Sequence, residues 1–274
     1  MKKAFVTGWP INQSKSPMLH GFWLKQYNIT GSYEAHSVAP ENFEKFLKEL
    51  PRSDLAGGNV TLPHKEIAFA NVDYLDEAAK AIGAVNTLWI EDKRLHGGNT
   101  DAYGFSANMD QYAPDWKNRK TATILGAGGA ARAIIHAVQK ADYQEIHIVN
   151  RTLERAENLC NLFGQKCQAY GWEAIPNLLS KTDLLINTTS IGMAGSDASM
   201  MPDLSNLPST ASVSDIVYVP LETPFLKAAN GLGLKTVDGL GMLLHQAVPG
   251  FEKWFGIRPE VTDELREYIL GLSS

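Results

Sequence analysis

The sequence contains only two cysteines, Cys160 and Cys167, among its 274 residues. Two cysteines are too few for a disulfide framework or a cysteine-rich zinc site, which favours a reducing compartment. The chain also lacks any apolar stretch of membrane-spanning length, and its first residues contain no signal-peptide core. We therefore expect a cytoplasmic protein that does not enter the membrane.

Positive charge is also scarce. The chain has 25 Lys and Arg against 30 Asp and Glu, a formal net charge of −5, and no dense basic cluster. This balance argues against a nucleic-acid partner. With 44% hydrophobic and 20% charged residues, the composition is that of a globular protein whose length allows two domains. The oligomeric state stays open, and a homodimer is compatible with the sequence.

The most informative pattern is a strand, a glycine turn, a helix and a second strand within about thirty residues. Residues 121–125 are apolar and β-branched, residues 126–131 have the form G-x-G-x-x-A, and residues 145–149 form the second apolar run. This is the context of a dinucleotide-binding fingerprint. Gly126 would allow the tight turn, and Gly128 would let the backbone approach a pyrophosphate. The N-terminus of the helix would then face the phosphates.

The end of the second strand indicates which dinucleotide is bound. An NAD site usually has Asp or Glu here to accept a hydrogen bond from the ribose 2′-hydroxyl. This chain has Asn150, Arg151 and Thr152 instead, followed by Arg155. Two guanidiniums suit a 2′-phosphate, so we expect NADP. The alternative is a solvated basic helix start, which two nearby glutamates partly support.

Strands alternate with helices from residue 121 onward, which predicts a parallel, doubly wound sheet. We expect its strands at 121–125, 145–149, 183–187, 212–219 and 234–237, with an irregular segment at 164–182 and a linker at 113–120. Residues 241–255 and 262–270 are expected to be helical, with Pro249 bending or breaking the first helix. Nearer the N-terminus, Ser16 is expected to cap a helix, Pro63 to open another, and residues 73–82 to form a third.

An enzyme that oxidises an alcohol with a nicotinamide needs a side chain that takes the proton. The chain has no Tyr-x-x-x-Lys pair and no zinc-ligand spacing, so no metal is expected. Lys65 is the leading candidate because the N–H groups of a first helical turn disfavour an ammonium. Asp101 could hold this lysine in place. The alternative for Lys65 is a solvated surface lysine, and the alternative for Asp101 is a simple helix cap.

The chain resembles the shikimate dehydrogenase family over nearly its whole length. The resemblance rests on ordered stretches at residues 14–20, 58–65, 83–87, 98–104, 126–131, 150–152, 187–193, 215–218 with 223–224, and 239–247. It implies reversible NADPH-dependent reduction of 3-dehydroshikimate to shikimate, in aromatic amino-acid biosynthesis. It also implies two domains. Residues 1–101 and 239–274 would form an α/β substrate domain to which the C-terminal helices return, and residues 102–238 a Rossmann-type NADP domain.

The resemblance assigns roles to individual residues. Lys65 would be the acid/base and Asp101 its partner. The substrate-binding residues would be Ser14 and Ser16 at the carboxylate, Tyr218 near it, and Thr61, Asn86, Asp101 and Gln246 at the ring hydroxyls or the reacting oxygen. The cofactor-binding residues would be Gly126, Ala127, Gly128, Gly129, Ala130, Asn150, Arg151, Thr152 and Arg155, with Ile216 and Gly239 near the nicotinamide. His20 and His245 are expected to be structural.

One position departs from the family pattern: Gly21 follows His20, where the family usually has Asn. We expect this change to affect the geometry of the substrate loop rather than the reaction itself. Two alternative functions remain. One is a quinate/shikimate dehydrogenase with relaxed substrate or cofactor use, since quinate differs from shikimate by one added hydroxyl. The other is a non-catalytic NADP-binding sensor, against which the presence of both Lys65 and Asp101 argues.

Overall fold

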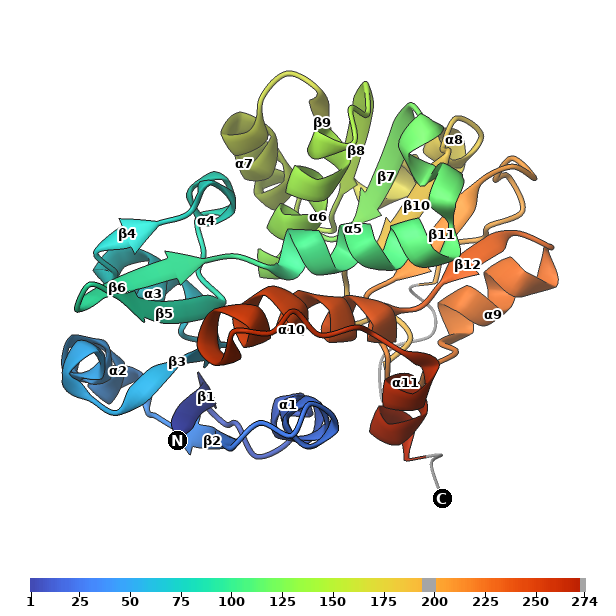
Figure 1. Ribbon diagram of the computed structural model, residues 1–274. Helices are drawn as coiled ribbons and strands as arrows, with labels where there is room; N and C mark the ends of the chain where they lie inside the picture. The colour runs from blue at the N-terminus through green and yellow to red at the C-terminus, as the bar shows by residue number, and fades with distance from the viewer. Residues whose placement is uncertain (194–200, 272–274) are drawn as a thin grey trace. The chain divides into compact units, whose positions relative to one another are not determined.

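The computed structural model describes residues 1–193 and 201–271 and divides the chain into two compact units. Unit 1 comprises Met1–Thr100 and Leu244–Ser274, and unit 2 comprises Asp101–Leu243. Each unit contains one β-sheet flanked by helices (Figure 1).

The sheet of unit 1 is mixed. Its strands, in the order β2-β1-β3-β5-β6-β4, are β1 (Lys2–Gly8), β2 (Gly31–Ser37), β3 (Leu55–Val60), β4 (Tyr74–Leu75), β5 (Thr87–Glu91) and β6 (Arg94–Gly98). Strand β1 is parallel to both β2 and β3, whereas β5 is antiparallel to β3 and β6. The carboxyl ends of β1 and β3 therefore share one edge, and the segments that follow them carry several predicted substrate residues.

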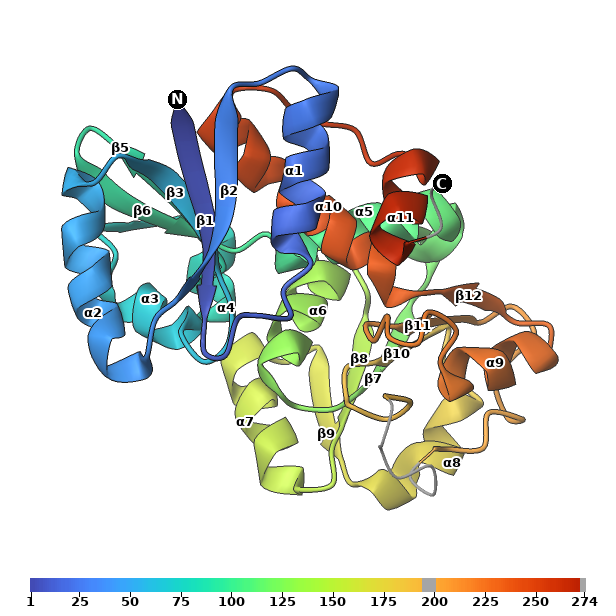
Figure 2. The same cartoon turned by 90° about the horizontal axis from the view of Figure 1, so that it is seen from below.

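The helices of unit 1 cover both faces of this sheet (Figure 2). They are α1 (Ser16–Gln26), α2 (Pro40–Glu49), α3 (Lys65–Asn71), α4 (Glu77–Ile82), α11 (Asp263–Leu270) and the part of α10 (Gly239–Phe255) from Leu244 onward, together with the 3-10 helix η1 (Leu50–Arg52). Apolar residues of α2, α3 and α4 pack on one face in a cluster that includes Phe5, Phe43, Ala68 and Leu88.

Three local predictions in unit 1 are wrong. The cap position of α1 is Lys15, and Ser16 is already the first helical residue. Helix α3 is capped at His64, so Pro63 precedes the helix. The expected helix 73–82 begins only at Glu77, because Asp76 caps it by accepting a hydrogen bond from the Ala79 N–H at 2.6 Å. The residues just before this cap pair with β6 as strand β4 instead.

The sheet of unit 2 is entirely parallel. In the order β12-β11-β10-β7-β8-β9, its strands are β7 (Thr121–Leu125), β8 (Glu145–Val149), β9 (Cys167–Tyr170), β10 (Leu184–Asn187), β11 (Ser212–Asp215) and β12 (Lys235–Val237). The chain starts at the centre, winds to one edge and returns to build the other half. This confirms the predicted doubly wound, Rossmann-type sheet.

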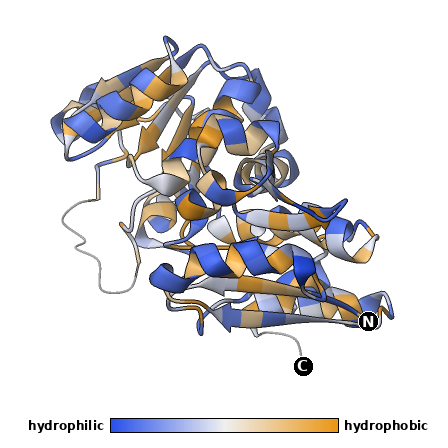
Figure 3. Ribbon diagram, turned by 90° about the vertical axis from the view of Figure 1, so that its left-hand side faces the viewer, coloured by the Kyte–Doolittle hydropathy of each residue, from blue (hydrophilic) through white to orange (hydrophobic). Residues whose placement is uncertain are grey.

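The helices of unit 2 lie on both sides of its sheet. They are α5 (Asp101–Tyr112), α6 (Gly129–Lys140), α7 (Leu153–Phe163), α8 (Ile175–Leu179), α9 (Pro224–Gly231) and the start of α10, with the 3-10 helices η2 (Pro114–Asn118) and η3 (Trp172–Ala174). Helices α6 and α7 cover one face, and α8 and α9 the other (Figure 2). Strands of this sheet are largely hydrophobic, whereas the helices alternate between hydrophilic and hydrophobic residues (Figure 3).

The linker predicted at residues 113–120 is wrong. Most of it forms η2, whose Trp116 side chain is fully buried. The Trp116 indole donates a hydrogen bond to Asp110 at 2.7 Å, and its carbonyl accepts one from the Tyr143 hydroxyl at 2.7 Å. These two bonds, together with the burial, integrate the segment into the core of unit 2. Pro249 lies inside α10, which is one continuous helix, so the predicted break is wrong, whereas the alternative of a bend stays a prediction.

The irregular segment predicted at 164–182 is also wrong, since it contains β9 and α8. Strand β9 has only four residues at the sheet edge, and its exposed Gln168 interrupts any apolar run. Among the residues described, none of the helices is long and apolar enough to cross a lipid bilayer.

Candidate active site

The glycine turn after β7 has the strained geometry that requires glycine at its first position. Gly126 has φ +105°, and a Cβ atom there would lie 2.7 Å from the Thr188 Oγ1. The Gly126 N–H donates to the Val149 carbonyl at 2.7 Å, which fixes the turn against the end of β8. Any other residue at this position would meet both backbone strain and a steric clash.

The next two glycines have open space around them. Gly128 caps α6 and Gly129 begins it, and a Cβ built at either position would meet no atom within 4 Å. The backbone N–H groups of this first helical turn can therefore approach a ligand closely. Such a turn favours anionic groups because its N–H groups and the helix dipole carry partial positive charge.

Asn150 connects the glycine turn to the end of the second strand. Its Oδ1 accepts a hydrogen bond from the Ala127 N–H at 3.2 Å, and its Nδ2 donates to the Thr152 carbonyl at 2.8 Å. Arg151 and Arg155 follow, both exposed, and no ion pair to a carboxylate is found for either guanidinium within the described part of the chain.

A hollow of about 310 Å³ lies over these elements. The residues lining it come from the carboxyl ends of β7, β8, β9 and β10 and are Gly126, Ala127, Gly128, Asn150, Arg151, Trp172, Thr188, Thr189, Ser190 and Ile191. Sequence reasoning selected the first five of them. It gave no role to Thr188–Ile191, although parallel strands place their carboxyl ends at one edge. Trp172 was missed because β9 was not predicted.

The other predicted cofactor residues lie outside this lining. Ala130 is in the first turn of α6 beside Gly129, and Thr152 and Arg155 are at the start of α7. Ile216 and Gly239 approach each other closely, because a Cβ at Gly239 would lie 2.2 Å from the Ile216 carbonyl oxygen. Tyr218, two residues beyond Ile216, is half-buried, and burial raises the pKa of its phenol.

A buried carboxyl group that sequence reasoning overlooked orders the loops after β10 and β11. Asp215 is fully buried and accepts hydrogen bonds from the Asn187 Nδ2 at 3.0 Å, the Val217 N–H at 3.0 Å and the Thr223 hydroxyl at 2.7 Å. Burial raises its pKa to about 6, against the opposing effect of these hydrogen bonds. Asn187 in turn accepts from the Thr189 hydroxyl at 2.6 Å, at the rim of the hollow.

Lys65, in unit 1, is the first residue of α3 and is half-buried. Its carbonyl accepts a hydrogen bond from the Val85 N–H at 3.0 Å, next to Asn86. Thr61 directly follows β3, and its N–H donates to the Thr7 carbonyl at 2.9 Å. In unit 1, three of the predicted residues, Thr61, Lys65 and Asn86, thus lie on segments that backbone hydrogen bonds join. Asp101 is the first residue of α5 in unit 2.

The predicted carboxylate-binding serines lie together. The Ser16 N–H donates to the Ser14 Oγ at 3.3 Å, and Ser16 is buried at the start of α1. Gln246 is half-buried in the unit 1 part of α10. Gly21 is exposed in α1, where a Cβ atom would meet nothing within 4 Å.

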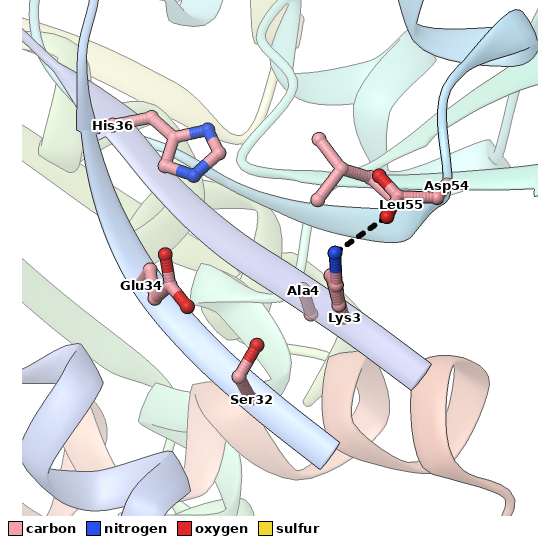
Figure 4. A pocket seen from close by; sticks show the side chains of 7 residues that line it. All are labelled: Lys3, Ala4, Ser32, Glu34, His36, Asp54 and Leu55. Carbon is pink, nitrogen blue, oxygen red and sulfur yellow. Dashed lines mark hydrogen bonds and ion pairs between the residues drawn. The ribbon is translucent and has the colours of Figure 1, made fainter. Parts of the chain in front are cut away.

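A second hollow, on the sheet of unit 1, is built from different residues (Figure 4). Lys3, Ser32, Glu34, His36 and Asp54 line it, and Lys3 pairs with Asp54 at 2.5 Å. None of the predicted site residues belongs to its lining. Among the described residues, no group of three His, Cys, Asp or Glu side chains could hold a metal ion.

Comparison with known families covers most of the chain. Residues 6–88 match the shikimate dehydrogenase substrate binding domain, residues 110–230 match shikimate/quinate 5-dehydrogenase, and residues 239–263 match the shikimate 5′-dehydrogenase C-terminal domain. The chain belongs to the shikimate dehydrogenase family. The resemblance seen in the sequence motifs is therefore confirmed.

Individual relatives in this family align over almost their full length. Shikimate dehydrogenase (NADP(+)) of Brucella melitensis is 57% identical over 272 residues, covering 98% of this chain and 94% of the relative. The structure of shikimate 5-dehydrogenase from Thermus thermophilus in complex with NADP(H) and shikimate is 34% identical, with a TM-score of 0.85 over 100% of both chains. Quinate dehydrogenase from Corynebacterium glutamicum in complex with NAD is 27% identical, with a TM-score of 0.91, covering 99% of this chain and 100% of that one.

Proposed function

We propose that this protein is a shikimate dehydrogenase that catalyses the reversible, NADPH-dependent reduction of 3-dehydroshikimate to shikimate, a step in aromatic amino-acid biosynthesis. The observation that carries the proposal is the full-length relationship to shikimate dehydrogenase (NADP(+)) of Brucella melitensis, at 57% identity over 98% of this chain. The presence of Lys65 and Asp101 supports an active enzyme rather than a cofactor-binding sensor.

We assign the cofactor to unit 2. The residues Gly126, Ala127, Gly128, Gly129 and Ala130 would hold the pyrophosphate, and Asn150, Arg151, Thr152 and Arg155 the adenosine end. Their chemistry fits, since the N–H groups around Gly128 and Gly129 are open to an anion and the two guanidiniums suit a 2′-phosphate. We assign Ile216 and Gly239 to the nicotinamide end. NADPH, when bound, supplies the hydride.

The substrate is assigned to polar residues that the sequence motifs select, Asp101 and Tyr218 among them. Ser14 and Ser16 would bind the carboxylate, and Thr61, Asn86 and Gln246 would hydrogen-bond to the ring hydroxyls. Short polar side chains on ordered backbone suit a small polyhydroxylated acid, because each hydroxyl needs a partner at fixed geometry.

Lys65 is assigned the proton transfer. In the reducing direction its ammonium group would donate a proton to the oxygen that becomes the new hydroxyl, and in the oxidising direction its amine would accept it back. Asp101 is assigned as the partner of that lysine. The bond from Val85 to the Lys65 carbonyl supports this role, because it fixes the backbone from which the side chain extends.

Two finer assignments remain predictions. The two free cysteines suit the reducing cytoplasm, which we propose as the location of the protein. A homodimer is a prediction that light scattering on the purified protein can check.

The reaction is tested by incubating purified protein with 3-dehydroshikimate and NADPH and identifying the product by mass spectrometry and NMR. We expect shikimate and stoichiometric NADP. Cofactor binding without product formation would support the sensor instead, and a product other than shikimate would change the assigned substrate.

A further inference from the structure

A chain of buried hydrogen bonds runs through unit 1 and ends at Asn86, one of the residues assigned to the substrate. The Tyr33 hydroxyl, on β2, donates to the Asn59 Oδ1 at 2.6 Å. The Asn59 Nδ2, on β3, is within hydrogen-bonding distance of the Asn86 carbonyl at 3.2 Å and of the Thr87 Oγ1 at 3.3 Å. Tyr33, Asn59 and Thr87 are all buried, so each of these bonds lies away from solvent.

At its far end this chain fixes the side chain of Asn86. The Asn86 Oδ1 accepts from the Thr87 hydroxyl at 2.9 Å and from the Thr100 N–H at 2.9 Å, while its Nδ2 donates to the Thr100 Oγ1 at 3.1 Å. The amide is therefore held in one orientation. That orientation determines which polar atom Asn86 can offer to a substrate hydroxyl.

The near end of this chain is the phenol of Tyr33. Burial raises the pKa of Tyr33 well above its ordinary value, and the neighbouring Ser16 hydroxyl and Asn59 oppose that shift. Tyr33 accordingly stays a neutral hydroxyl that can donate its hydrogen bond to Asn59.

Aromatic rings hold Tyr33 in place. His20 stacks on it with ring centroids 3.9 Å apart, and Trp254 lies at 5.8 Å. Burial lowers the pKa of His20 to about 3, so the stacked imidazole is neutral. Trp254 is itself fixed by donating to the Leu88 carbonyl at 2.8 Å. The hydroxyl of Tyr33 therefore has little freedom to move away from Asn59.

We propose that Tyr33 is a positioning residue, whose hydroxyl fixes the orientation of the Asn86 side chain through Asn59 and Thr87. It acts through Asn86 and touches no substrate atom itself. The inference rests on the proposed function, because it takes Asn86 as a substrate ligand. It adds a buried support that holds Asn86 in the orientation that a substrate hydroxyl requires.

The test is Tyr33→Phe, with Tyr143→Phe as its matched control. Tyr143 is a buried tyrosine of unit 2 whose hydroxyl also donates one hydrogen bond, to the Trp116 carbonyl at 2.7 Å. We expect Tyr33→Phe to raise the KM for shikimate about three- to tenfold, the size expected for one misaligned hydrogen bond. Its KM for NADP should stay within about twofold of wild type. Tyr143→Phe should lower the melting temperature comparably and leave both KM values unchanged.

A second variant cuts the same chain at its other end. Thr87→Val removes the bonds to Asn59 and Asn86, and Thr182→Val, which removes a buried hydroxyl bonded to Thr123 in unit 2, is its control. A selective rise in the shikimate KM for either folded unit 1 variant, absent from its control, supports the positioning role. An unchanged shikimate KM in both folded variants would overturn it. A wild-type protein without shikimate turnover would instead overturn the proposed function, and the positioning role with it.

Discussion

The backbone N–H of Val85 donates a hydrogen bond to the carbonyl oxygen of Lys65 at 3.0 Å. This single bond joins the first turn of α3 to the segment that carries Asn86, although the two are distant in sequence. The backbone at Lys65 is therefore held both by helix α3 and by the neighbouring segment that contains Val85. Such support is what a proton-transferring side chain needs to keep its position during the reaction.

Replacing Lys65 by alanine should lower kcat by about 10² or more with little change in the shikimate KM, the usual loss for a positioned acid/base. Lys80→Ala is the control, because Lys80 is an exposed helical lysine of the same unit that pairs with Glu77. Steady-state kinetics of both variants measures the effect. A near-normal kcat for Lys65→Ala would remove this lysine from the mechanism.

The choice of cofactor should depend on Arg151 more than on Arg155. Arg151 lines the hollow over the glycine turn, and Arg155 does not. Arg151→Gln should raise the KM for NADP about tenfold, the loss expected for a charge-assisted hydrogen bond, and leave the KM for NAD nearly unchanged. Arg155→Gln should have a smaller effect. Equal losses with NADP and NAD would show that Arg151 does not read the 2′-phosphate.

Two glycines of the same turn should respond differently to alanine. Gly126→Ala should destabilise unit 2 by about 1–3 kcal/mol, because residue 126 has φ +105° and its Cβ would crowd the Thr188 hydroxyl. Gly128→Ala should leave thermal stability unchanged, since its Cβ would meet open space. It should nevertheless weaken NADP binding, because we assign the pyrophosphate to the space into which that Cβ would project. Thermal unfolding and calorimetric titration separate the two effects, and similar melting temperatures for both variants would contradict this account.

Asp215 should make stability fall as pH rises. Its pKa is about 6 in the folded protein against an ordinary value of 3.8, so between these values the folded state binds more protons than the unfolded state. The free energy of unfolding therefore decreases through this window by as much as about 3 kcal/mol and levels off above it.

The Asp215→Asn variant removes this titration while keeping an oxygen acceptor at the site. The unfolding free energies of wild type and variant are measured with urea at pH 4.5 and pH 7. The value for the variant minus the value for wild type should be larger at pH 7 than at pH 4.5. A difference that does not change with pH would show that Asp215 is not protonated in the folded protein at low pH.

Most of the Rossmann-type unit could be predicted because its central strands are short, buried apolar runs. Thr121–Leu125 is buried along its entire length, so its sequence alone indicates a central strand. The edge strand β9 has no such run, and its pairing with β8 depends on tertiary context. Trp116 illustrates the same limit. It lies between Pro114 and several charged residues, and only its burial shows that the segment is part of the core.

The candidate site was predictable where a motif places residues on a single turn, as at Gly126 and Gly128, or directly after a predicted strand, as at Asn150. It was not predictable where side chains from distant segments meet. Asp215 and Thr223, or Tyr33 and Asn59, become partners only when the sheet is assembled. Neither pair has a local spacing signature, so the sequence alone does not predict these contacts.

The most direct test of the central claim is a set of initial rates for the purified protein with shikimate and with quinate, each with NADP and with NAD, followed through the absorbance of the reduced cofactor. We predict turnover confined largely to shikimate with NADP. Comparable turnover of quinate, or a preference for NAD, would contradict the assigned substrate and the role given to Arg151. No turnover with any pair would contradict the assignment as an enzyme.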